Sequence, residues 1–354
     1  MKRNVIKVLV YDSKPFVSES FENVKADKIK FSYTSDKLNA STVRLLKDYD
    51  TLVAFVNDQI DNKVIDELVK QGKKAIFLRS SGFNNVDLNY ADGKLKVFRV
   101  PSYSPHAVAE HAFALIQTSN RRIHKAYMRT REFNFSLDGL IGNDLINKTI
   151  GIIGTGKIGR VMIDIANGYK MKVIAYDPFP VPNPSNFSYV SLPELLERSD
   201  IISLHCPLTE ETKHILNKET LSKTKKGVMI VNTSRGALID SKALLEAIKS
   251  RHVSGACLDV YEEETNIFFE DKSNHILDDE VLRDLISMPN VIVTSHQGFL
   301  THEALENIAH TVVDNIINFF GGTPRNENEI HATMWAMKMK GNKWNIENKQ
   351  RLVE

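Results

Sequence analysis

The sequence contains little cysteine and almost no net charge, and it has no long apolar run. Its two cysteines, Cys206 and Cys257, are too few for a disulfide framework in 354 residues, which is typical of a reducing, cytoplasmic compartment. The net charge of +2 provides no bulk attraction to nucleic acid or to a membrane surface. No segment approaches the roughly 18 uninterrupted apolar residues of a membrane span. The amino terminus also lacks the apolar core of a signal peptide, so we expect a soluble cytoplasmic protein.

The composition is that of an ordinary globular protein. Hydrophobic residues make up 42% and charged residues 25% of the chain, which excludes disordered, collagen-like and coiled-coil classes. At roughly 100 to 200 residues per domain, the length predicts about two domains. The two prolines of Val100–Pro105 stiffen the chain and mark a boundary. Apolar spacing predicts one long helix from His106 to about Glu132 and another over His302–Phe320.

Short apolar runs alternate with helical patterns, and this alternation predicts the fold class. Up to about Val100 it indicates an α/β unit with a parallel sheet. From Thr149 onward the spacing suits a doubly wound parallel sheet, because each crossover needs a helix or a long connection. We therefore predict an α/β protein with two Rossmann-like or flavodoxin-like domains. The later apolar segments are TIGIIG, KVIAYD, DIISLHC, GVMIVNTS, VSGACLDV and NVIVTSH.

Gly154, Gly156 and Gly159 form a G-x-G-x-x-G pattern between the predicted strand Thr149–Ile153 and an amphipathic helix. The first glycine permits a tight turn, the second lets the backbone approach a pyrophosphate, and the third lets helix and strand pack closely. Asp177 ends the next predicted strand, 18 positions after Gly159, where a ribose-binding acid is expected. A glycine turn with an incidental surface aspartate is the weaker interpretation. The pattern predicts NAD(H) as the cofactor, because Asp177 would repel the 2′-phosphate of NADP(H) and no arginine follows to neutralise it.

Polar side chains follow three later strands of the same predicted sheet. Arg235, the glutamates Glu262 to Glu264, and His296 each come directly after an apolar segment. Because ligands bind at the carboxyl ends of such strands, we expect these side chains to converge. Together they suffice for hydride transfer to a 2-oxo acid: an arginine to grip its oxygens, a histidine to supply a proton and a carboxylate to keep the imidazole charged. Taken singly, the histidine suits a structural role and the glutamates a solvated loop. Spacing does not show which glutamate faces inward.

Seven segments of the sequence carry a resemblance to a known family: RSSGFNNVDL, RVPSYSPHAVAEHA, GIIGTGKIGR, HCPLTEETKHILN, MIVNTSRGALID, LDVYEEET and TSHQGFLT. They are similar to the D-specific 2-hydroxyacid dehydrogenases, and among them to the fermentative D-lactate dehydrogenases. The likeness covers about residues 5 to 324. It implies a discontinuous substrate-binding domain, residues 1–101 plus 300–330, and an NAD-binding domain, residues 102–299, with the site in the cleft between them. Residues 331–354 would form an extension of unknown role.

The resemblance also implies roles for individual residues. Arg235, Glu264 and His296 would be the catalytic residues, which chooses among the glutamates by analogy alone. Backbone N–H groups around Ser81 and Gly82 would contact the substrate carboxylate, and Tyr103 and Phe299 would narrow the pocket. Thr233 and Asp259 would lie near the nicotinamide, and His205 to Pro207 would border the adenosine half. The implied cofactor-binding set is Gly154, Gly156, Lys157, Ile158, Gly159, Asp177, His205, Cys206, Pro207, Thr212, Thr233 and Asp259.

The implied activity is the NADH-dependent, reversible reduction of a small 2-oxo acid to the D-2-hydroxy acid. Pyruvate to D-lactate is the first expectation, with His296 supplying the proton. Another 2-oxo acid, of the hydroxyisocaproate or glycerate type, stays open as the substrate. A dinucleotide-sensing, corepressor-like interaction protein on the same fold also stays open. We expect a homodimer or homotetramer, and no metal, because no acidic or histidine pair has metal-ligand spacing in a convincing context.

Overall fold

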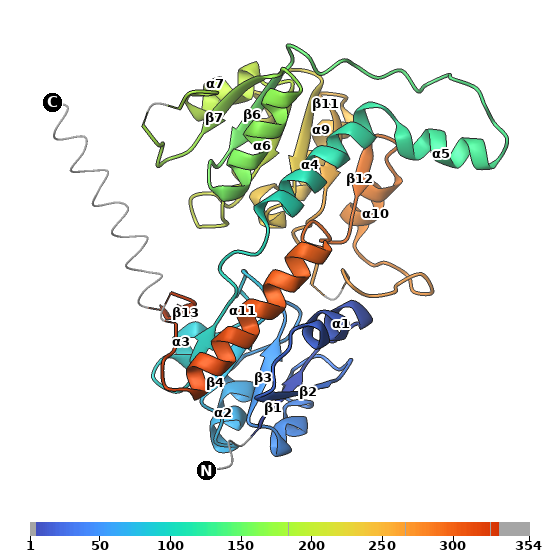
Figure 1. Cartoon of the computed structure of the whole chain (residues 1–354). Coiled ribbons are helices and arrows are strands. Elements are labelled where there is room, and N and C mark those ends of the chain that lie inside the picture. The colour runs from blue at the N-terminus through green and yellow to red at the C-terminus, as the bar shows by residue number, and fades with distance from the viewer. Residues whose placement is uncertain (1–4, 183, 266, 326, 333–354) are drawn as a thin grey trace. The chain divides into compact units, whose positions relative to one another are not determined.

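The computed structural model describes residues 5–182, 184–265, 267–325 and 327–332 (Figure 1). The chain divides into two compact units. One comprises the described residues up to Ser104 and those from Thr301 onward, and the other is Pro105–Leu300. Of the extension expected at 331–354, residues 333 and beyond lie outside the described residues.

The first unit is built on a sheet of order β13-β5-β4-β3-β1-β2. Strands β1 to β5 are parallel and have the 2-1-3-4-5 order of flavodoxin-like domains, so the predicted α/β class is confirmed. Only β13 runs antiparallel in this described sheet, where Glu329 pairs with Phe98 of β5. This two-residue edge strand carries no apolar run that would have predicted it. The strands are β1 (Ile6–Val10), β2 (Ile29–Tyr33), β3 (Thr51–Ala54), β4 (Ala75–Leu78), β5 (Lys96–Phe98) and β13 (Glu329–Ile330).

Helices cover both faces of this sheet. Successive residues of a strand point to opposite faces, so each strand contributes apolar side chains to both layers. In β4, Ile76 packs into a core with helix α2, whereas Phe77 packs on the other face against Phe319 of α11, with ring centroids 5.9 Å apart. Helix α2 begins where expected, since the Asp61 carboxylate accepts the N–H of Val64 as a cap. The helices are α1 (Pro15–Asn23), η1 (Val43–Asp48), α2 (Asn62–Lys70), α3 (Leu88–Ala91) and α11 (His302–Phe320).

The second unit is built on a parallel sheet of order β12-β11-β10-β9-β6-β7-β8. All six apolar segments predicted as strands are present, and only the two-residue β8 was not expected. The chain runs outward from β6 to β8, returns at β9 and continues to β12. The direction therefore reverses between β6 and β9, the place where doubly wound sheets bind ligands. The strands are β6 (Thr149–Ile153), β7 (Lys172–Tyr176), β8 (Ser188–Tyr189), β9 (Ile201–Leu204), β10 (Val228–Asn232), β11 (Val253–Leu258) and β12 (Val291–Val293).

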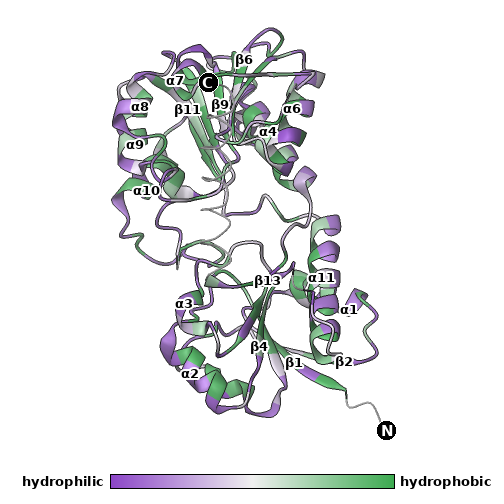
Figure 2. Cartoon of the chain, turned by 90° about the vertical axis from the view of Figure 1, so that its left-hand side faces the viewer, coloured by the Kyte–Doolittle hydropathy of each residue, from purple (hydrophilic) through white to green (hydrophobic). Residues whose placement is uncertain are grey.

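Two apolar layers enclose this second sheet. Ile152 and Val231 pack toward α4 and α6, whereas the neighbouring Ile153 and Ile230 pack toward α7, α9 and α10. Figure 2 shows the result as hydrophobic colour along the strands and mixed colour on the covering helices. The helices are α4 (Pro105–Asn120), α5 (Ile123–Arg131), α6 (Lys157–Gly168), α7 (Leu192–Arg198), α8 (Lys218–Ser222), η2 (Gly236–Leu238), α9 (Ser241–Lys249) and α10 (Glu280–Ser287).

The single long helix predicted from His106 to about Glu132 is wrong. It is interrupted between α4 and α5, where Arg122 adopts a left-handed backbone with φ of +54°. Helix α4 is buried along its length, but none of the described α5 residues is buried, so no packing holds α5 in line with α4. The other long helix is confirmed as α11. None of the helices in the described ranges is long and apolar enough to cross a membrane.

Candidate active site

The glycine-rich loop lies at the reversal point of the second sheet. Gly154 has φ of +96°, and a Cβ there would lie 2.6 Å from the backbone nitrogen of Cys206, which follows β9. Gly159 packs so closely on the Gly154 carbonyl that any side chain would collide. At Gly156 the corresponding space is open. The loop can thus present its backbone and the free N–H groups of the α6 start to a pyrophosphate.

Asp177 follows β7 and is held beside this loop. Its Oδ2 accepts the backbone N–H of Thr155 at 2.7 Å and the Thr155 hydroxyl at 2.9 Å. Its Oδ1 accepts the N–H of Phe179 at 2.9 Å. The carboxylate is only half-buried, at the position where a ribose-binding acid is expected.

The loop after β9 carries His205 to Pro207. Burial lowers the pKa of His205 to about 4, so its imidazole is neutral at pH 7. Its Nε2 lies 2.9 Å from the Ser203 hydroxyl, but its buried Nδ1 has no hydrogen-bond partner among the described residues. Burial raises the pKa of the Cys206 thiol to about 12, which makes it unreactive. The Thr212 hydroxyl closes the loop by donating to the Pro207 carbonyl at 2.7 Å.

The residues after β10 connect this loop to the arginine. The Ser234 hydroxyl donates to the Cys206 carbonyl at 2.7 Å, and the Asn232 amide donates to the Arg235 carbonyl at 2.8 Å. The half-buried Arg235 side chain donates to the Ser234 carbonyl at 2.6 Å. The hydroxyl of Thr233 is buried, and within the described chain nothing bonds to it. With His205 Nδ1, it makes two unsatisfied polar atoms at this sheet edge, as expected of a site that receives a polar ligand. The residues present therefore fit a dinucleotide.

Asp259 follows β11 and organises the loop after β12. Its buried carboxylate accepts the N–H groups of Gln297 and Gly298 at 2.9 and 2.8 Å and the Thr294 hydroxyl at 2.6 Å. His111 of α4 lies 3.2 Å from the same carboxylate. Burial alone would raise the pKa of Asp259, but the hydrogen bonds from His111 and Thr294 hold it below its ordinary value. No local pattern in the sequence connects a histidine on α4 with an aspartate after β11, so only the structure shows this contact.

His296 and Glu264 are in direct contact. The Nδ1 atom of His296 lies 2.9 Å from Oε1 of Glu264, and Oε2 of Glu264 accepts the backbone N–H of Tyr261 at 3.0 Å. The backbone N–H of His296 donates to the Asp259 carbonyl at 2.7 Å, and His296 has a left-handed backbone with φ of +53°. The two side chains are 22% and 26% exposed. Of the three glutamates left open by spacing, Glu264 is thus the one that contacts the imidazole.

The remaining expected substrate residues are placed within their own units. Ser81 and Gly82 follow β4 at the carboxyl edge of the first sheet, where the Arg99 guanidinium donates to the Ser81 carbonyl at 2.9 Å. The carbonyl of Tyr103 accepts the Asn307 amide at 3.2 Å. Phe299, in the second unit, is buried. These residues and Arg235 therefore all follow strands or lie in connecting segments, as binding residues commonly do.

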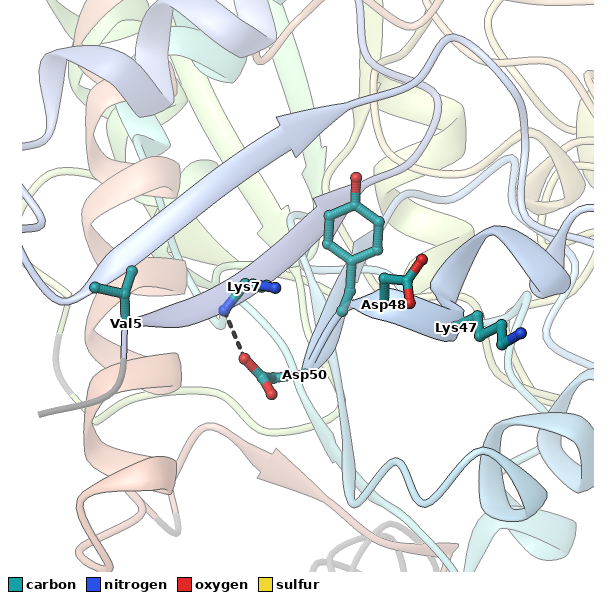
Figure 3. A pocket seen from close by; sticks show the side chains of 6 residues that line it. Val5, Lys7, Lys47, Asp48 and Asp50 are labelled. Atoms are coloured by element: carbon teal, nitrogen blue, oxygen red, sulfur yellow. Dashed lines mark hydrogen bonds between the residues drawn. The ribbon is translucent and has the colours of Figure 1, made fainter.

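A hollow in the first unit lies at the wrong edge of its sheet for this chemistry. Its lining includes Lys7, at the start of β1, and Asp50, just before β3, and the backbone N–H of Lys7 donates to the Asp50 carboxylate (Figure 3). Ligands of doubly wound sheets bind at the opposite, carboxyl edge. Among the described residues, no group of three or more His, Cys, Asp or Glu side chains is arranged to hold a metal ion.

Comparisons with known proteins agree with this geometry. The NAD binding domain of D-isomer specific 2-hydroxyacid dehydrogenases matches residues 113–298. A 2-hydroxyacid dehydrogenase homolog of Haemophilus influenzae is 47% identical over 321 residues, covering 90% of this chain and 97% of the relative. The D-lactate dehydrogenase of Escherichia coli is 46% identical over 321 residues, covering 90% and 98%. The structure of the pyruvate reductase of Chlamydomonas reinhardtii matches with a TM-score of 0.87 and 42% identity, covering 91% and 98%. The chain therefore belongs to the D-isomer specific 2-hydroxyacid dehydrogenase family and is an NAD-dependent oxidoreductase that reduces 2-oxo acids.

Proposed function

We propose that this enzyme reduces pyruvate to D-lactate with NADH, in a reversible reaction. The observation that carries the proposal is the His296–Glu264 contact of 2.9 Å at the same sheet edge as Arg235 and the glycine-rich loop. Relatives named D-lactate dehydrogenase and pyruvate reductase, each matching nine-tenths of the chain, support pyruvate as the substrate.

Each residue of the proposed catalytic set has one task. Arg235 binds the substrate carboxylate and polarises the carbonyl, because a guanidinium offers several donors in a planar fork. Glu264 holds His296 through Nδ1, which leaves Nε2 as the nitrogen that gives its proton to the carbonyl oxygen. NADH, when bound, supplies the hydride.

The binding residues divide into cofactor and substrate sets. Substrate would contact the backbone of Ser81 and Gly82 and the side chains of Tyr103 and Phe299. Two observations support the cofactor assignment. There is open space at Gly156, and the buried Nδ1 of His205 and the hydroxyl of Thr233 have no hydrogen-bond partner among the described residues. The cofactor set is Gly154, Gly156, Lys157, Ile158, Gly159, Asp177, His205, Cys206, Pro207, Thr212, Thr233 and Asp259.

The proposed assembly is a homodimer or homotetramer. Helix α5 and the segment after it expose large apolar side chains: Phe133, Leu137 and Ile141 are 84%, 80% and 89% exposed. Monomeric proteins rarely leave so much apolar surface along one segment, and a second copy of the chain would cover it. Sedimentation analysis at micromolar concentration tests this, and a monomer would contradict it.

A cytoplasmic location is also proposed, supported by the free thiols of Cys206 and Cys257. Cell fractionation tests it.

The experiment is turnover with a panel of 2-oxo acids. Purified protein is mixed with NADH and pyruvate, a branched 2-oxo acid or hydroxypyruvate, and the loss of NADH absorbance is followed. We expect the highest kcat/KM with pyruvate and a product that is the D enantiomer. The matched variant His296→Gln should lower kcat on the order of 10²- to 10⁴-fold while NADH binding, measured by fluorescence, stays nearly intact. Preference for another acid would correct the substrate. Absence of turnover with every acid, despite NADH binding, would favour a dinucleotide-sensing protein over an enzyme.

A further inference from the structure

A histidine–glutamate pair outside the proposed catalytic set joins two loops of the second unit. His214 lies in the loop after β9, and Glu262 lies in the loop after β11. The Nε2 atom of His214 is 2.5 Å from Oε1 of Glu262, and the two side chains are 34% and 22% exposed. This contact connects the loop that carries Pro207 and Thr212 with the loop that carries Glu264.

The two loops enclose the turn that follows Arg235. On one side, the backbone N–H of His214 donates to the Ala237 carbonyl at 2.9 Å. On the other side, Gly236 lies against the backbone of Tyr261 and Glu262 so closely that a Cβ would collide with it. The Arg235 turn is therefore held between the two loops, and the His214–Glu262 contact closes this ring with a side-chain bond.

The same bond acts on the turn that orients Glu264. The backbone N–H of Tyr261 binds Oε2 of Glu264, and Glu262 is the next residue in the chain. Any displacement of Glu262 is transmitted to this N–H, and from it to the carboxylate that holds His296. His214 also has a left-handed backbone, with φ of +52°.

We propose that His214 and Glu262 form a positioning pair for the dehydrogenase reaction. The pair fixes the position of the turn after Arg235 relative to the turn that contains Glu264. This inference rests on the proposed function. The pair touches neither substrate nor the reacting atoms; it acts through the Gly236–Ala237 backbone and the Tyr261 N–H. Loss of the pair should therefore lower kcat/KM for pyruvate more than it weakens the binding of NADH.

The test is a double-mutant cycle on the full-length protein. His214→Ala and Glu262→Ala should each lower kcat/KM for pyruvate about 10-fold, because small misplacements of catalytic groups are costly in rate. The double variant should be no worse than either single variant, since both remove the same bond. The dissociation constant of NADH should change by less than about 3-fold, and the melting temperature should stay within a few degrees of wild type.

Two further variants separate positioning from general loss of structure. Glu262→Gln keeps an oxygen that accepts from Nε2–H, so it should recover most of the kcat/KM that Glu262→Ala loses. The matched control is Lys249→Ala, which removes a bond of 2.7 Å to Asp284 between α9 and α10 in the same unit. Lys249→Ala should have wild-type kinetics.

Several results would overturn the pair's role while leaving the proposed function intact. These are wild-type kcat/KM in His214→Ala, a double variant whose loss is the product of the single losses, no recovery in Glu262→Gln, or losses that follow the melting temperature. If the wild-type protein reduces no 2-oxo acid, the proposed function fails first and the positioning role falls with it.

Discussion

The carboxylate of Glu264 bridges two groups, the Nδ1 atom of His296 at 2.9 Å and the backbone N–H of Tyr261 at 3.0 Å. One oxygen therefore faces the imidazole while the other is anchored to the main chain, so the carboxylate cannot rotate freely. A carboxylate fixed in this way orients the imidazole ring. This relationship underlies the first prediction.

Replacing Glu264 by Gln should slow pyruvate reduction. The amide has one acceptor oxygen where the carboxylate has two, so it cannot accept both from His296 and from the backbone N–H of Tyr261, and the imidazole loses its fixed orientation. We expect kcat to fall about 10- to 100-fold, with NADH affinity nearly unchanged. Steady-state kinetics and fluorescence titration measure the two effects. The control is Glu263→Gln, which should keep the wild-type kcat. An unchanged kcat in Glu264→Gln would mean that another group orients the histidine.

Replacing Arg235 by Lys should weaken substrate capture. The guanidinium offers a planar fork to the carboxylate and carbonyl oxygens, whereas an ammonium is a single point of charge. We expect kcat/KM for pyruvate to fall on the order of 10- to 100-fold, mainly through KM. NADH affinity, measured by fluorescence titration, should be nearly unchanged. Arg283→Lys, on the exposed face of α10, is the matched control with no effect. An unchanged KM in Arg235→Lys would remove the arginine from the substrate site.

Asp177 should make NADH the preferred cofactor over NADPH. The backbone N–H of Thr155 donates to its carboxylate, which is thereby held beside the glycine-rich loop. The carboxylate would repel a 2′-phosphate, which predicts a preference for NADH of roughly 5- to 150-fold. The ratio of kcat/KM for the two cofactors measures it. Asp177→Asn keeps the size of the side chain and removes its charge, so the ratio should shrink toward one while the NADH value falls. Comparable efficiency of wild-type protein with both cofactors would refute this role.

Asp58 should give the first unit a pH-dependent stability. This buried carboxylate accepts the N–H groups of Leu38 and Phe55, both at 2.6 Å, yet burial raises its pKa to about 7. The unfolded value is about 4, so between these values the native state binds more protons and the free energy of unfolding falls as pH rises. Asp58→Asn removes this titration but turns an amide N–H₂ toward one of the two donors, a cost of about 1 to 3 kcal/mol.

Urea unfolding of wild type and Asp58→Asn at pH 5 and pH 8 measures both effects. The variant should be less stable at both values, and the difference from wild type should be larger at pH 5 than at pH 8. A difference of the same size at both pH values would mean that Asp58 is ionised in the native state throughout this range. Asp61→Asn, which keeps a helix cap, is the control without a change between the two pH values.

Local patterns in the sequence were sufficient for most of the secondary structure and for the class of cofactor. The six apolar segments after Thr149 became strands, and the spacing of apolar residues in His302–Phe320 became α11, because periodicity reports which face of an element is buried. The glycine pattern predicted a strand–loop–helix turn because positive φ at Gly154 and close packing at Gly159 exclude side chains.

Elements without a strong local pattern escaped prediction. The two-residue strands β8 and β13 exist because a neighbouring strand offers hydrogen bonds, not because of their own residues. The interruption at Arg122 lies where the buried residues of α4 end, since none of the described α5 residues is buried. Tertiary context decides such positions, since short segments gain too little stability from local interactions.

The sequence by itself therefore determined the α/β class, the dinucleotide loop and the set of polar residues that follow the strands, because turn chemistry and periodicity act between near neighbours. Only the tertiary structure decided which of these residues meet. Glu264 contacts His296, Glu262 contacts His214, and His111 reaches Asp259. Each contact joins side chains from separate loops or helices, and its formation depends on how the strands are ordered in the sheet, which no short stretch of sequence encodes.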